Sequence, residues 1–113
     1  MDIFEKAGIA YNEAFDGINV KENEQIVLEC KNLHWSYFFA KNIKGADIKA
    51  HERVILEFKN PNYSCYFARD IFSANIEEHF KVVFNSGDKE WFDEFIKEVN
   101  YKNTKVEEWL LYI

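Results

Sequence analysis

Proline and glycine are scarce in this sequence, with one proline and four glycines among 113 residues. Average proteins contain about 5% proline and about 7% glycine. This scarcity argues against a collagen-like chain, disorder and a loop-rich β-sandwich, and it favours helices. The hydrophobic fraction of 48% is large enough to form a core without disulfides or metals.

Long apolar runs, excess positive charge and cysteine patterns are also missing. No run of about 18 apolar residues occurs, and the first residues lack the basic and apolar segments of a signal peptide. Fourteen lysines and arginines against twenty aspartates and glutamates give a net charge of −6, which removes a general attraction to nucleic acid and anionic membranes. Cys30 and Cys65 are isolated and indicate no disulfide framework. We therefore expect one domain over residues 1–113, located in the cytoplasm without membrane contact.

The sequence does contain an internal repeat with an offset of 28 residues. Residues 20–32 (VKENEQIVLECKN) align with residues 48–60 (IKAHERVILEFKN), with six identities in thirteen. Residues 36–51 align with residues 64–79, with seven identities in sixteen. The units cover roughly residues 4–31, 32–59, 60–87 and 88–113, and the last one is truncated.

Each unit is predicted to be two short helices joined by a turn. Side chains that accept hydrogen bonds from the free amides of a helix start recur at two positions of the unit. The first position holds Asn32, Asn60 and Asp88, and the second holds Asn19, Asp47, Asn75 and Asn103. Apolar residues align at helical spacing, as in the column of Tyr11, Phe39, Phe67 and Phe95 and the column of Phe15, Ile43, Ile71 and Val99.

A pair of helices of about ten residues cannot bury its own apolar face, whereas stacked pairs form one continuous core. We therefore predict an all-α fold: an α-solenoid of about four helix-turn-helix repeats, with about eight helices.

The third unit carries a resemblance to a known type of repeat. The segment NPNYSCYFARDI of residues 60–71, followed by ANIE of residues 74–77, resembles the N-P-x-Y-S-Y-x-F-A-R-D-V-x-G-A-D-I-x repeats of uncharacterised bacterial and phage proteins. Arg69 and Asp70 match that pattern, whereas Phe72 and Ser73 depart from its polar residue and glycine. The resemblance implies short α-helical repeats and an origin in a mobile element, and it supplies no catalytic residues.

Catalytic and metal-binding patterns are absent from the sequence. It has no glycine-rich phosphate loop, no His-Glu-x-x-His, no paired CxxC and no Gly-x-Ser-x-Gly. Ser36 and Ser64 occupy the same position of two repeats, and we interpret them as small residues in a contact between packed helices, not as nucleophiles. His51 and His79 also repeat, but no third metal ligand accompanies them, and we expect surface histidines on the second helices. The sequence therefore predicts a non-enzyme without cofactor or metal.

Binding to a protein partner is the function that the sequence favours. Net charges of −4, +2, −1 and −3 fall on residues 1–31, 32–59, 60–87 and 88–113, so both ends of the chain are acidic and suit a partner with a basic surface. Several aromatic residues are left over from the core columns, and exposed aromatics often anchor interfaces. The candidate partner-binding residues are Glu22, Glu24, Tyr37, Phe38, Tyr66, Phe72, Glu107 and Glu108. Together with the resemblance, they suggest a phage-encoded inhibitor of a bacterial defence nuclease, of the anti-CRISPR type, acting in the host cytoplasm.

Two other functions stay open. Lys41, Arg69 and Lys97 form a column of cations, preceded three residues earlier by Phe38, Tyr66 and Glu94. A cation beside an aromatic residue, repeated along a solenoid, is typical of helical repeats that bind single-stranded RNA, and Glu94 breaks this pattern. The negative net charge opposes that reading. A structural or oligomerisation module is the third possibility.

The last unit differs from the others at three positions of its second helix. Val106, Trp109 and Ile113 replace mostly polar residues of the inner units. We expect them to be covered, either by a second copy in a homodimer, by the partner, or by folding of the last helix onto Trp91 and Phe92.

Overall fold

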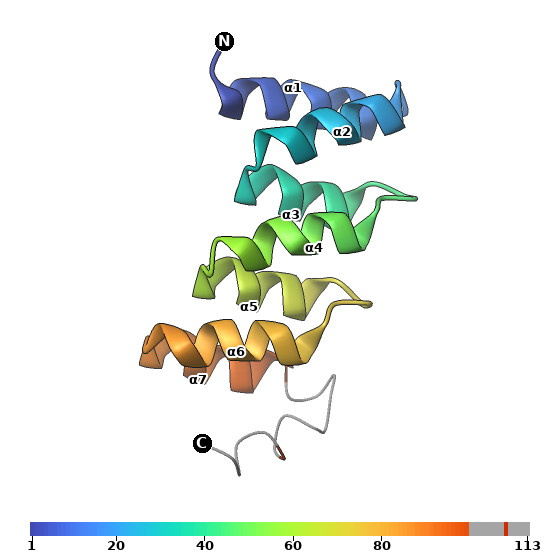
Figure 1. Cartoon of the computed structure of the whole chain (residues 1–113). Helices are drawn as coiled ribbons and strands as arrows, with labels where there is room; N and C mark the ends of the chain where they lie inside the picture. The colour runs from blue at the N-terminus through green and yellow to red at the C-terminus, as the bar shows by residue number, and fades with distance from the viewer. Residues whose placement is uncertain (100–107, 109–113) are drawn as a thin grey trace. The chain divides into compact units, whose positions relative to one another are not determined.

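The computed structural model describes residues 1–99 and Glu108, and every regular element in that part of the chain is a helix (Figure 1). The all-α prediction is therefore confirmed. In chain order the helices are α1 (Ile3–Phe15), α2 (Val20–Cys30), α3 (Leu33–Asn42), α4 (Ile48–Glu57), α5 (Pro61–Asp70), α6 (Ile76–Ser86) and α7 (Lys89–Val99). They belong to two compact units, the first over Met1–Phe58 with α1–α4 and the second starting at Lys59 with α5–α7. None of the described helices is long and apolar enough to span a membrane.

The predicted caps mark the helix starts at most repeated positions. The side chains of Asn32, Asn60 and Asp88 accept hydrogen bonds from backbone amides three residues later, at 3.0, 3.1 and 3.2 Å. Asp47 and Asn75 do the same at the starts of α4 and α6, at 3.1 and 3.3 Å. These bonds satisfy amides that have no partner within the helix, which is why Asx residues stand at these positions.

Of the predicted caps, Asn19 is not a cap in the structure, and Asn103 is not among the described residues. Asn19 precedes α2 in the left-handed conformation, with φ of 44°, and its side chain makes no capping bond, so the cap prediction is wrong there. Asn103 and the predicted eighth helix, apart from Glu108, lie outside the described residues. Asp2, which is not among the predicted caps, accepts a hydrogen bond from the amide of Glu5 at 2.7 Å and caps α1.

The core of the first unit joins the hairpin α1–α2 to the hairpin α3–α4. Its buried residues come from α1, α2, α3 and the turn after α3, and they are Ala10, Tyr11, Ala14, Val27, Phe39 and Ile43. Phe15 is wrongly placed in the core by the repeat alignment. It is 61% exposed because it is the last residue of α1, at the edge of the core, where its ring centroid lies 6.0 Å from that of Tyr11.

Gly8 lets α1 approach the indole ring of Trp35 in α3. A Cβ atom at residue 8 would lie 2.8 Å from Cζ2 of Trp35, closer than such atoms can approach. The absence of a side chain at this position in α1 is therefore part of the packing between the two hairpins.

The substitution Gly8→Ala should lower the free energy of unfolding by about 1–2 kcal/mol. Displacing a packed ring costs about 1–3 kcal/mol, and the better helix propensity of alanine recovers up to about 1 kcal/mol. Chemical denaturation measures the change. The control Asn12→Ala, at an exposed position of the same helix, should stay within about 0.5 kcal/mol. Equal stability of the Gly8→Ala variant and the unmodified protein would contradict the packing of Trp35 against residue 8.

The second unit has its own core between α5, α6 and α7. Its buried residues are Cys65, Ala68, Ile76, Phe80, Val83, Phe95 and Val99. Phe67 of α5 is also fully buried and packs against the ring of His79, with the ring centroids 5.3 Å apart. The predicted column of Tyr11, Phe39, Phe67 and Phe95 is therefore buried throughout.

Candidate functional site

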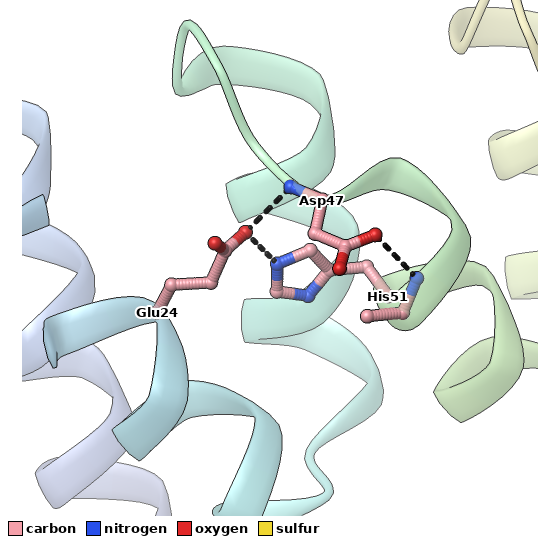
Figure 2. Close-up of polar contacts among 4 residues, drawn as sticks. Glu24, Asp47 and His51 are labelled. Carbon is pink, nitrogen blue, oxygen red and sulfur yellow. Dashed lines mark hydrogen bonds and ion pairs between the residues drawn. The ribbon is translucent and has the colours of Figure 1, made fainter. Parts of the chain in front are cut away.

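A polar cluster around the buried ring of His51, which we call the Glu24 node, connects α2 to the start of α4 (Figure 2). One carboxylate oxygen of Glu24, Oε2, accepts a hydrogen bond from the backbone amide of Asp47 at 2.7 Å and lies 2.9 Å from Nε2 of His51. Asp47 in turn accepts a bond from the amide of Ala50 at 3.1 Å, which caps α4. A single side chain of the first repeat thus holds both the cap and the first turn of α4 in the second repeat.

His51 is completely buried in this node, and its ring stacks on Phe39 with centroids 5.0 Å apart. Burial lowers the pKa of His51 from its ordinary value of 6.5, and this effect outweighs the opposite pull of Glu24 and Asp47. The ring is therefore neutral at neutral pH, with Nε2–H donating to Glu24. Its Nδ1 atom has no hydrogen-bond partner among the described residues, so a second proton on the ring would be buried without an acceptor.

The expectation of surface histidines on the second helices is wrong. His51 and His79 are both 0% exposed and pack on the buried phenylalanines Phe39 and Phe67. The physical reason is that an aromatic neighbour covers the face of each imidazole, which a reading of helix periodicity alone does not reveal.

The stability of the protein should fall as the pH drops below about 6.5. Because the pKa of His51 is lower in the folded state, the unfolded chain binds more protons between that lowered value and 6.5, so unfolding becomes easier as the pH falls through this window. Above pH 6.5 the ring of His51 is neutral in both the folded and the unfolded chain, so its burial no longer makes the stability depend on pH. Denaturant unfolding at a series of pH values measures it.

The variant His51→Asn, which copies the residue of the first repeat at this position, Asn23, should lose part of that pH dependence. Burial also lowers the pKa of His34, so His34 contributes in the same direction and remains in the variant. An unchanged pH profile in His51→Asn would contradict the role of His51.

The described residues offer little catalytic or metal chemistry. No group of three histidine, cysteine, aspartate or glutamate side chains that could hold a metal ion occurs in residues 1–99 or at Glu108. The thiol of Cys65 is buried, and burial raises its pKa to about 11, so the reactive thiolate is disfavoured. Ser36 and Ser64 are completely buried as well. None of these groups is accessible to a substrate.

The predicted partner-binding residues divide into buried and exposed ones. Tyr37 is only 5% exposed and Glu24 belongs to the node, so neither forms an open surface. Phe38 and Tyr66 are half-buried. The exposed members are Glu22, Phe72 and Glu108. Glu107 and the proposed oligomer residues Val106, Trp109 and Ile113 lie outside the described residues.

Two of the three cations in the column that suggested RNA binding, Arg69 and Lys41, contact neighbouring side chains. The guanidinium of Arg69 lies 5.2 Å from the ring centroid of Tyr66 and forms two hydrogen bonds with the carboxylate of Asp70, at 2.7 and 2.8 Å. Nζ of Lys41 lies 5.5 Å from the ring centroid of Tyr37, four residues earlier in α3. These contacts favour local ion pairing and cation–π packing over an open row of base-stacking sites.

Phe72 is the most exposed large hydrophobic residue among those that the structure describes. It lies in the turn between α5 and α6 and is 95% exposed. Ile71 before it and Ile76 after it are buried, and the amide of Ala74 donates to the carbonyl of Ile71 at 3.1 Å. The turn is thus fixed on both sides while the ring of Phe72 stays in solvent.

Comparisons with known proteins gave no match: no protein-family model, curated protein or solved structure is significantly similar to this chain.

Proposed function

We propose that this chain is a non-catalytic helical-repeat protein that binds a protein partner. The observation that carries the proposal is the 95% exposure of Phe72 in a well-anchored turn. The same position of the two earlier repeats holds Asp16 and Lys44, so the repeat itself does not require an aromatic there. Exposed aromatics held in fixed positions are frequent energetic centres of protein interfaces.

The exposed charges of α6 and α7 suggest a basic partner. At the start of α6, Glu77 and Glu78 are exposed, and one cation, Lys81, pairs with both at 3.9 and 3.3 Å. Acidic residues are also exposed along α7, at Glu90, Asp93 and Glu94. Opposite potentials accelerate association and set the register of the complex. With the net charge of −6 and the resemblance to phage repeats, this favours an inhibitor of a bacterial nuclease whose basic groove binds nucleic acid.

The same proposal includes the stacking of the repeats as an α-solenoid. It is supported by the shared hairpin design of α1–α2, α3–α4 and α5–α6, each with a capped first helix. Small-angle X-ray scattering tests it, because a solenoid is longer than a compact sphere. A radius of gyration of about 13 Å, the value for a compact globule of this length, would contradict stacking.

The partner hypothesis is tested by comparing three immobilised proteins in a bacterial lysate. These are the unmodified chain, Phe72→Lys, which copies the residue of the second repeat, and the control Lys44→Ala. We expect a protein to be retained by the unmodified chain and by Lys44→Ala, and its affinity for Phe72→Lys to fall by about tenfold or more, as for an interface hot spot. Equal retention by all three proteins would contradict a role of Phe72.

The same assay separates the RNA alternative. Retention of single-stranded RNA that weakens steeply from about 50 to 200 mM salt would favour an RNA-binding solenoid over the protein partner. Circular dichroism of each variant confirms that the fold is intact.

A further inference from the structure

A small apolar hollow, which we call the α6–α7 hollow, lies where α6 ends and α7 begins. Its volume is about 210 Å³, below the range of about 300–1,000 Å³ typical of small-molecule sites, so it suits one or two side chains. Phe84 at its edge is 41% exposed, and its ring centroid lies 6.1 Å from that of Phe92. The lining residues are Val83, Phe84, Gly87, Asp88, Lys89 and Phe92.

The first unit contains the same junction two repeats earlier, where α2 ends and α3 begins. Lys31 and Gly87 both end their helices in the left-handed conformation, with φ of 47° and 72°, and each donates its amide to a carbonyl three residues earlier. Asn32 and Asp88 then cap the next helices with equivalent hydrogen bonds. The backbone around the hollow therefore has a counterpart whose covering helix is known.

In the first unit that covering helix is α4, which packs against α2 and α3. Its last residue, Glu57, forms an ion pair with Lys31 at 3.7 Å. Two repeat lengths of 28 residues later, Lys31 corresponds to Gly87 and Glu57 corresponds to Ile113. The number of residues from Ile43 to Ala50 in the first unit equals the number from Val99 to Val106, so the chain is long enough to reach the same place.

Between the two junctions, the residues of the junction and those of the segment that follows both become more apolar. At the junction itself, Gly87 stands where the first unit has Lys31, and Phe92 stands where it has Ser36. In the C-terminal segment, Trp109 stands at the position of Arg53 and Ile113 at the position of Glu57. At the first junction Lys31 and Glu57 form an ion pair, whereas the residues at the same two repeat positions of the second junction are Gly87 and Ile113.

We propose that the α6–α7 hollow is the docking site of the C-terminal segment of the same chain, residues 106–113, with Trp109 and Ile113 against Phe84 and Phe92. Burying these side chains removes from water an apolar surface that would otherwise stay exposed. This proposal is independent of the partner-binding function, because Phe72 does not line the hollow.

The test places a photoreactive benzophenone side chain at residue 84 of the full-length protein, where an exposed aromatic already stands. Irradiation should give a cross-link within one chain, mapped by mass spectrometry to residues 106–113. The same probe at residue 72 is the matched control and should not react with that segment. A cross-link between two chains would overturn the proposal in favour of a dimer, and the absence of any cross-link to residues 106–113 would overturn it altogether.

A second measurement uses thermal unfolding midpoints of Phe84→Ser, Trp109→Ser and the double variant. If the two side chains touch, the double variant should lose less than the sum of the two single shifts. Phe72→Ser combined with Trp109→Ser should give additive shifts. Additivity for residues 84 and 109 as well would contradict the contact.

Discussion

Replacing Phe67 by alanine should lower the free energy of unfolding by about 3–5 kcal/mol, the range measured when a buried phenylalanine is truncated. Phe67 is completely buried in α5 and packs against the imidazole of His79. Truncation removes the burial of the ring and leaves a cavity that the helices can fill only in part. For a domain of about 100 residues, a loss of this size is a large fraction of the whole stability.

Equilibrium denaturation with urea, followed by circular dichroism, measures this loss. The matched control is Phe72→Ala, five residues later, where the same side chain is removed from solvent rather than from the core. The control should change the stability by less than about 0.5 kcal/mol. If Phe67→Ala cost less than about 1 kcal/mol, the aromatic column could not be the centre of the packing.

Replacing Glu24 by alanine should cost about 2–3 kcal/mol. The carboxylate accepts bonds from the buried imidazole of His51 and from the amide of Asp47, and its removal leaves the imidazole donor without a partner. An unsatisfied buried donor costs about 1–3 kcal/mol, and the amide of Asp47 loses a bond to a charged acceptor.

The control for Glu24→Ala is Glu22→Ala, in the same helix and exposed. It removes the same charge and should stay within about 0.5 kcal/mol. Equal effects of the two variants would mean that the charge of α2 matters and the node does not. For the same reason, a charge reversal meant to probe the acidic surface should use Glu22 alone, because reversal of Glu24 also breaks the node.

The local features of the fold were predictable because they depend on neighbouring residues. Asn32, Asn60 and Asp88 bond to amides three residues away, and the aromatic column follows from helical spacing. The cap prediction fails at Asn19 because its backbone is left-handed and its side chain forms no hydrogen bond with the amides of α2. The residue type alone does not show this conformation.

The candidate site was harder to predict because its partners are distant in the sequence. Glu24 and His51 are 27 residues apart and lie in different hairpins. The spacing of apolar residues along each helix therefore predicts that both lie at the surface. One signal was present: Glu24 is repeated as Glu52 and His51 as His79, although neither type is needed for an apolar core. Tyr37 belongs to none of the aligned core columns, which predicts exposure, yet its side chain is buried.

The Glu24 node also has a consequence for the way in which the first unit unfolds. In repeat proteins, cooperativity arises from the coupling energy between adjacent repeats, and repeats without such coupling open one at a time. Glu24 belongs to the hairpin α1–α2, while Asp47 and His51 belong to the hairpin α3–α4, so fraying of either hairpin breaks the same two hydrogen bonds. The node therefore ties the two hairpins into one cooperative folding unit, and amide protons in α2 and α4 should exchange with solvent through a common opening event.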